Sequence, residues 1–170
     1  PEQEIYQIAV IIEDASDNNY GNFRKGMDQA AMEFNADVRF ITLYEKLEPN
    51  QQMEFIVREQ EDGADALIVV PVDEGQVADA LSKKQVNIPT VLLGTGKSGE
   101  NAAGSISVDY RQMGRKLAEG MVKRLPEGCP VMVLSEPEGL NAVSGDFLEG
   151  AEEVLEGSGH NCQRIVLEEE

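Results

Sequence analysis

Short runs of aliphatic residues alternate along the chain with longer segments in which apolar residues recur every three or four positions. The short runs, bounded by turn residues, predict strands, and the longer segments predict amphipathic helices. The predicted strands are residues 6–12, 38–43, 66–70, 90–93, 105–108, 131–134 and 164–167. Several of them are apolar on both faces, which is typical of parallel strands that helices cover on both sides.

Five helices are predicted between these strands. Pro49, Asp73 or Glu74, and Asp109 mark the starts of the second, third and fourth helices, because proline suits the first turn and carboxylates cap free backbone amides. The five apolar faces are expected on Phe23, Met27, Ala30 or Ala31 and Phe34; on Met53, Ile56 and Val57; on Val77, Ala80 and Leu81; on Met113, Leu117 and Met121; and on Phe147, Ala151, Val154 and Leu155. This alternation predicts an α/β fold with a doubly wound parallel sheet.

A polar loop, residues 13–20, follows the first predicted strand and leads directly into the first predicted helix. Open α/β sheets bind small ligands at the carboxyl ends of their parallel strands. Asp17, Asn19 and Tyr20 are therefore candidate ligand contacts. Helix capping is an alternative role for Asp17 and Asn19, and ordinary aromatic packing is an alternative role for Tyr20.

The net charge of the chain disfavours some classes of binding partner. The 170 residues include 32 acidic and 14 basic side chains, so the formal net charge is −18. Such a charge opposes binding to phosphate backbones and to anionic membrane surfaces, and nucleic acid is not expected as a direct partner of this segment. No apolar run reaches the roughly 20 residues that span a bilayer. Pro1 is not a native start, so we expect an N-terminal piece to have been removed.

Four stretches carry a resemblance to a known superfamily. They are IAVIIEDASDNNYGNFRKGMDQAA, DGADALIVVPVD, NIPTVLLG and SISVDYRQMGRKLAEGMV. In this order they resemble the type I periplasmic binding proteins, which include sugar-binding solute receptors and the effector domains of LacI-like repressors. The resemblance covers nearly the whole chain. It implies a two-lobed fold, with a ligand-binding lobe at residues 1–108 and the beginning of a second, apparently truncated lobe at residues 109–170.

The resemblance also implies binding rather than catalysis, no cofactor, and a small ligand clamped between the lobes, such as a sugar or a related polyol. By motif position, the residues expected to contact the ligand are Asp17, Asn19, Tyr20, Asp73, Thr95, Asp109 and Asn141. Asp73 and Asp109 each precede a helix, so capping is their alternative role. Mobility of a Gly- and Ser-rich loop is the alternative for Thr95.

The chain departs from many sugar-binding members of the superfamily in two places. Gly94-Thr95 stands where they carry an Asp-Arg pair, and Ser144-Gly145-Asp146 stands where they carry an arginine. The sequence also has no tryptophan for stacking on a sugar ring. These departures favour a ligand unlike ribose or galactose, or a pocket with little affinity for free sugars.

The resemblance implies two functions. The first is a receptor of an ABC importer or a sensor, whose hinge closure is read by a membrane transporter or sensor subunit outside the cytoplasm, in the periplasm or lipid-anchored at the cell surface. The alternative is the effector domain of a cytoplasmic LacI-like regulator, with its DNA-binding headpiece upstream of Pro1. The acidic start PEQE favours export.

The two cysteines bear on the same choice. Cys129 and Cys162 precede strands that we expect to be parallel neighbours, a spacing compatible with a disulfide, although free thiols are the usual state in a reducing compartment. Neither cysteine has metal-ligand spacing, and His160 is expected to be exposed in a turn between glycines, so no metal site is predicted.

A phosphoacceptor receiver domain is an alternative of a different class. Such domains gather acidic residues, a hydroxyl and a lysine around Mg²⁺ at strand ends, and Glu13, Asp14, Asp73, Thr95 and Lys97 imitate that set. A receiver domain closes after five strand–helix units, however, and here further strands follow the helix at Asp109. The hydrolase signature GxSxG is also absent from the sequence, which gives no support to a hydrolase of that type.

Overall fold

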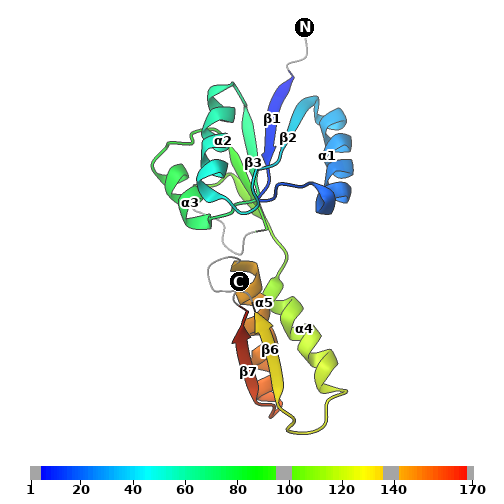
Figure 1. Cartoon of the computed structure of the whole chain (residues 1–170). Helices are drawn as coiled ribbons and strands as arrows, with labels where there is room; N and C mark the ends of the chain where they lie inside the picture. The colour runs from blue at the N-terminus through cyan, green and yellow to red at the C-terminus, as the bar shows by residue number, and fades with distance from the viewer. Residues whose placement is uncertain (1–4, 95–100, 136–141, 168–170) are drawn as a thin grey trace. The chain divides into compact units, whose positions relative to one another are not determined.

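The computed structural model describes residues 5–94, 101–135 and 142–167 (Figure 1). The chain divides into two compact units, Pro1–Ile106 and Ser107–Glu170. Each unit combines parallel strands with helices, so the predicted α/β class is confirmed. None of the helices in the described ranges is long and apolar enough to cross a membrane.

The first unit is built on a five-stranded parallel sheet with the order β2-β1-β3-β4-β5. Its strands are β1 (Tyr6–Ile11), β2 (Ala36–Ile41), β3 (Ala66–Val69), β4 (Thr90–Leu93) and β5 (Gly104–Ile106). Its helices are the short 3₁₀ helix η1 (Asn18–Tyr20), α1 (Gly21–Phe34), α2 (Pro49–Glu61) and α3 (Glu74–Ser82). In Figure 1, α2 and α3 lie on one side of the sheet and α1 on the other.

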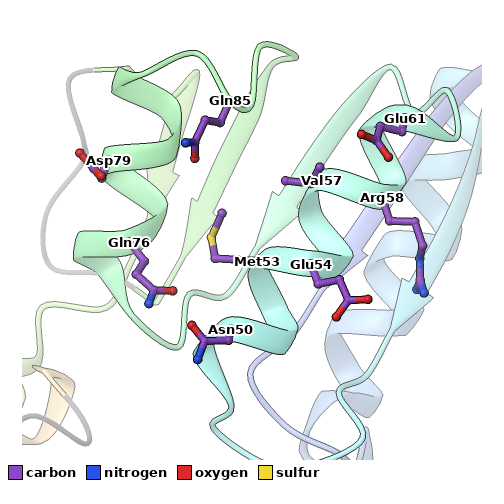
Figure 2. Close-up of a pocket in the computed structure, with 9 residues that line it drawn as sticks. All are labelled: Asn50, Met53, Glu54, Val57, Arg58, Glu61, Gln76, Asp79 and Gln85. Carbon is purple, nitrogen blue, oxygen red and sulfur yellow. The ribbon is translucent and has the colours of Figure 1, made fainter.

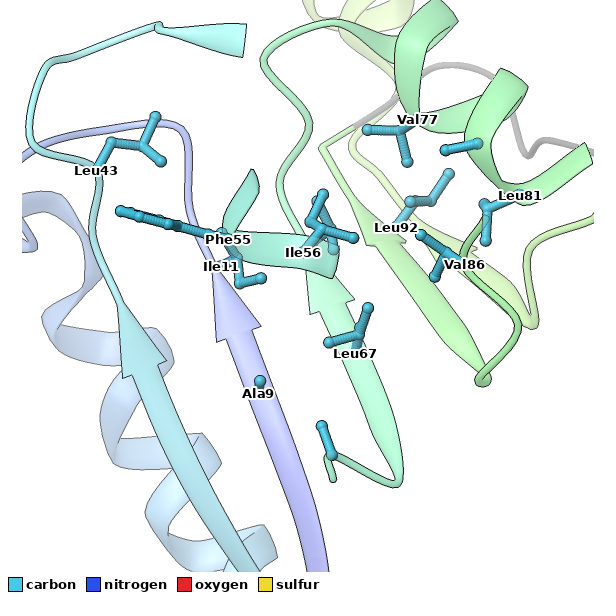
Figure 3. Packing of buried hydrophobic residues seen from close by; sticks show 13 residues of the cluster. Ala9, Ile11, Leu43, Phe55, Ile56, Leu67, Val77, Leu81, Val86 and Leu92 are labelled. Atoms are coloured by element: carbon cyan, nitrogen blue, oxygen red, sulfur yellow. The ribbon is translucent and has the colours of Figure 1, made fainter. Parts of the chain in front are cut away.

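The core of this unit lies between the sheet and the α2 and α3 helices (Figure 3). Ile11 and Leu67 of the central strands are fully buried there against Phe55 and Ile56 of α2. Burying a large aliphatic or aromatic side chain stabilises a fold by about 1.5–3 kcal/mol, so these contacts hold the central strands and α2 together. The carboxyl ends of β1 and β3 are neighbours because Ile11 pairs with Val69.

The described residues of the second unit form two helices and two parallel strands: α4 (Tyr110–Val122), β6 (Val131–Ser135), α5 (Ala142–Gly157) and β7 (Cys162–Val166). The two helices meet at Gly114 and Gly150. A Cβ at Gly114 would lie 1.9 Å from the Phe147 carbonyl oxygen, and a Cβ at Gly150 would lie 2.1 Å from the Arg111 carbonyl oxygen. Only glycine allows the backbones to approach this closely.

The predicted strands and helices are all present, and the strand ends differ from the predictions by at most two residues. The buried face predicted for α4 is wrong, because Met113 and Leu117 are 47% and 51% exposed while Gly114 and Ala118 are buried. Gly114 and Ala118 are small enough to let α5 pack closely against α4. On α1, Phe23, Met27 and Ala31 of the predicted face are the partly buried residues, whereas Phe34 departs from the prediction because it is 68% exposed.

Candidate ligand-binding site

The loop between β1 and α1 is held in shape by its own polar side chains. Asp14 Oδ1 accepts a hydrogen bond from the Ser16 amide at 3.1 Å, and Ser16 Oγ accepts one from the Asn18 amide at 3.3 Å. The Tyr20 amide then donates to the Asp17 carbonyl at 2.9 Å, which closes η1. Such local turns stabilise a backbone without regular secondary structure, so these bonds support the observed conformation of the loop.

Tyr20 lies half-buried at the end of this loop. Its hydroxyl donates a hydrogen bond to Glu13 Oε2, and its ring packs edge-on against Phe23 and Phe40, with centroid separations of 6.1 and 5.8 Å. Edge-to-face pairs of this kind add about 0.5–1.5 kcal/mol beyond the area that they bury. The position of the ring is therefore fixed before any ligand arrives.

Asp17 and Asn19 do not cap a helix in this structure. The Asp17 carboxylate makes no capping hydrogen bond and forms an ion pair with Arg24, whose guanidinium also lies 5.0 Å from the centre of the Phe40 ring. Asn19 lies within η1 and is exposed. The capping role considered for these residues is thus wrong, and Asp17, Asn19 and Tyr20 share one short stretch at the edge of the sheet.

Two further candidates do cap helices. Asp73 follows β3 and accepts a hydrogen bond from the Gln76 amide at 3.0 Å, while Asp109 accepts one from the Gln112 amide at 2.8 Å. Asp73 belongs to the same sheet edge as the β1 loop, because β3 is the neighbour of β1. Asp109 belongs to the second unit. Thr95 and Asn141 lie outside the described residues.

The sequence patterns did not single out Gln52, which is the polar residue most closely tied to this edge. It lies on the buried face of α2 with only 1% of its surface exposed, and its side-chain amide contacts the backbone just beyond both β1 and β3. The available signal was its spacing: Gln52 precedes Phe55 and Ile56 by three and four residues and so falls on their helical face.

A family model described as a periplasmic binding protein domain matches residues 8–169. The chain belongs to this family. The superfamily resemblance seen in the sequence is therefore confirmed. A comparison with curated proteins gives no match to the sequence of this periplasmic binding protein domain.

Solved structures agree with the family assignment. An ABC transporter solute binding protein from Agrobacterium vitis bound with α-D-tagatopyranose is 18% identical, with a TM-score of 0.79 over 95% of this chain and 58% of that one. One from Actinobacillus succinogenes with bound D-allose is 18% identical, with a TM-score of 0.78 over 95% of this chain and 59% of that one. A LacI-family repressor from Corynebacterium glutamicum is 18% identical, with a TM-score of 0.68 over 94% and 55%. At these identities the likeness shows the fold alone, and the chain spans less than two thirds of each of these structures.

A groove of about 700 Å³ also opens between α2 and α3 of the periplasmic binding protein domain (Figure 2). It is lined by Asn50, Met53, Glu54, Val57, Arg58, Glu61, Gln76, Asp79 and Gln85. None of these is a predicted ligand residue, and the lining comes from α2, α3 and the segment after α3 rather than from the loops after β1 and β3. The groove is therefore separate from the candidate site.

The two cysteines of the domain are free thiols, so the disulfide considered from the sequence is not formed in this structure. In the β6–β7 register Cys162 is opposite Val131, two residues beyond Cys129, which sets the thiols diagonally. His160 is only 5% exposed, and its Nδ1 lies 3.0 Å from the Cys129 carbonyl oxygen. The predicted exposure of His160 is wrong, because the glycines around it turn the chain so that the ring packs inward. No group of three metal-ligating side chains occurs among the residues that the structure describes.

Proposed function

We propose that this periplasmic binding protein domain is the ligand-binding part of a small-molecule receptor, for a sugar or related polyol, that serves an ABC importer or a membrane sensor. The observation that carries the proposal is the sheet edge, where a fixed aromatic ring and two carboxylates follow adjacent strands, at Tyr20, Asp17 and Asp73. Family membership and the fold of sugar-bound neighbours support it.

The chemistry of this edge suits a polyhydroxylated ligand. Carboxylates accept hydrogen bonds from ligand hydroxyls, and charged acceptors make stronger bonds than neutral ones. The Tyr20 ring offers an apolar surface to the C–H groups of such a ligand. In this proposal the ligand also bridges to the second lobe, beginning at Asp109, and favours a closed state by binding it more tightly than the open one. In this proposal the ligand is bound and released chemically unchanged, so the protein acts as a receptor rather than an enzyme.

The compartment follows from this role. A receptor for an importer or a surface sensor works outside the cytoplasm, in the periplasm or anchored to the membrane by a lipid, and its closed state is recognised by the transporter or sensor subunit. The net charge of −18 is compatible with such a soluble, ligand-capturing module and opposes direct contact of this segment with nucleic acid.

A second candidate is the effector domain of a LacI-like regulator. The observation that favours it is the similarity in fold to the Corynebacterium glutamicum repressor. Reading the coding DNA on both sides of this segment separates the two candidates. A secretion signal upstream supports the receptor, and a helix-turn-helix upstream supports the regulator.

Titration calorimetry on the complete protein tests the site. D-allose and D-tagatose are the first probes, and we expect micromolar or tighter binding of at least one of them. Asp17→Ala and Tyr20→Ala should each weaken binding at least tenfold, by about 1.4 kcal/mol or more.

The matched control is Asp79→Ala, which also breaks a surface ion pair, with Lys83 on α3, but lies away from the sheet edge. Surface pairs contribute only about 0–1 kcal/mol to stability, so Asp17→Ala and Asp79→Ala should melt at similar temperatures. Unchanged affinity in both Asp17→Ala and Tyr20→Ala would refute the site assignment.

A further inference from the structure

The ladder between β1 and β3 ends at a proline. The Val70 amide donates to the Ile11 carbonyl at 2.9 Å, and the next residue, Pro71, has no N–H to continue the pairing. The backbone groups that follow still need partners, because buried N–H and C=O groups left unpaired cost about 1–3 kcal/mol each. Among these groups are the Ile12 carbonyl, directly before Glu13, and the Val72 amide, directly before Asp73.

Gln52 supplies the missing partners from α2. Its Nε2 donates to the Ile12 carbonyl at 3.2 Å and to the Val70 carbonyl at 2.8 Å. Its Oε1 accepts from the Val72 amide at 2.8 Å. One side-chain amide therefore uses both donor hydrogens and its oxygen to join the two strand ends where the ladder has stopped.

We infer that Gln52 is a positioning residue for ligand binding, which fixes the spacing and direction of the two loops that carry the candidate contacts. Ile12 directly precedes Glu13, whose carboxylate accepts a hydrogen bond from the Tyr20 hydroxyl. Val72 directly precedes Asp73. The backbone groups that Gln52 binds at Ile12 and Val72 are thus each one residue from a loop of the candidate site, and Gln52 itself is not a proposed ligand contact. This inference rests on the proposed function, because the loops matter only if they bind.

The buried position of Gln52 supports a specific role over a generic one. A glutamine that merely filled space on this face of α2 would be disfavoured against leucine or methionine, since burying an amide is costly unless its hydrogen bonds are made. Here they are made to the loop stems rather than to α2, so the bonds order the stems. The requirement is for an amide, because only it combines two donors with an acceptor at this point.

The test compares Gln52→Leu in the complete protein with Thr90→Val. Thr90 is equally buried, at 2% exposure, and its hydroxyl donates to the Ile88 carbonyl at 3.1 Å, at the opposite, amino end of the sheet. Both variants therefore lose buried hydrogen bonding, but only one lies at the site. Gln52→Met, which keeps an unbranched apolar chain, replaces Gln52→Leu if the latter does not fold.

Two readouts are expected to respond. Amide hydrogen exchange at Val72 should become at least tenfold faster in Gln52→Leu and stay unchanged in Thr90→Val. The Kd for whichever of D-allose and D-tagatose the unmodified protein binds should rise at least tenfold in Gln52→Leu and less than twofold in Thr90→Val, measured where both proteins are fully folded.

The two proposals fail differently. Unchanged exchange at Val72, or equal changes in exchange and affinity in both variants, would overturn the role of Gln52. If the unmodified protein binds neither D-allose nor D-tagatose, the proposed sugar-receptor function fails, and the exchange result alone decides whether Gln52 orders the loops.

Discussion

The Cys162 thiol packs against the apolar core of the second unit, beside Leu155 and Ala151. Burial raises its pKa, and the nearby carboxylates of Glu156 and Glu152 raise it further. Because the thiolate is the reactive form, we expect Cys162 to react with iodoacetamide at pH 8 more slowly in the folded protein than in urea. Peptide mapping by mass spectrometry measures both rates, and equal rates would contradict the packing described here.

The same shift links this thiol to stability. A folded-state pKa above the unfolded value favours the neutral thiol in the folded protein, so the stabilisation is present below the unfolded pKa and is lost as the pH rises through the folded pKa. Acidification through the carboxylate range leaves this contribution intact.

Single residues at the site were predictable to different degrees. Helix capping was one of the two roles predicted for Asp73 and Asp109, and both residues do cap helices. This role was predictable because a carboxylate directly before a helix is a local sequence signal. The Asp17–Arg24 pair and the Gln52 contacts were not predicted. Each depends on how two elements are placed, and the contacts of Gln52 span up to 40 residues of sequence.

At the scale of elements, the crossing of α4 and α5 gives a sharp prediction. Gly114→Ala places a methyl group 1.9 Å from the Phe147 carbonyl oxygen, a backbone atom that moves only if the helices separate. We expect a loss of about 1–3 kcal/mol in the free energy of unfolding, typical of overpacking. Urea denaturation followed by circular dichroism measures it.

The control for this prediction lies in the same helix. A Cβ at Gly120 meets nothing within 4 Å, so Gly120→Ala should be neutral or stabilising by up to about 1 kcal/mol through better helix propensity. If both substitutions changed stability by the same amount and in the same direction, helix propensity rather than close approach would explain the result.

The prediction of buried helix faces succeeded for α3, where Val77, Ala80 and Leu81 are buried, and failed for α4. Apolar spacing found a genuine stripe on α4 at Met113 and Leu117, yet the helix packs through Gly114 and Ala118. Periodicity marks residues that avoid water, whereas close helix packing selects residues that leave room for a neighbour. The second criterion depends on α5, which the α4 sequence does not contain.

At the scale of the molecule, fold class followed from the alternation of elements, because continuous apolar strands need helices on both faces. The order β2-β1-β3-β4-β5 was not predicted. Strand order depends on pairings between distant segments, such as Ile11 with Val69, and both segments look alike in sequence. The strands and helices could therefore be predicted from local sequence, whereas the pairing of each strand with its neighbours in the sheet could be seen only in the structure.

The net charge of −18 is a property of the whole chain, and it predicts a response to salt. With 32 acidic against 14 basic side chains, mutual repulsion opposes the compact state. Raising NaCl from about 0.01 M to 0.15 M shortens the Debye length from about 30 Å to about 8 Å and screens this repulsion. Salt also weakens surface ion pairs such as Lys83–Asp79, but each contributes only about 0–1 kcal/mol. The excess of like charges should prevail, so we expect Tm at pH 7 to rise by several degrees, measured by differential scanning calorimetry. KCl should act equally, because the effect is one of ionic strength, and a Tm that falls with either salt would show that ion pairs outweigh the net charge.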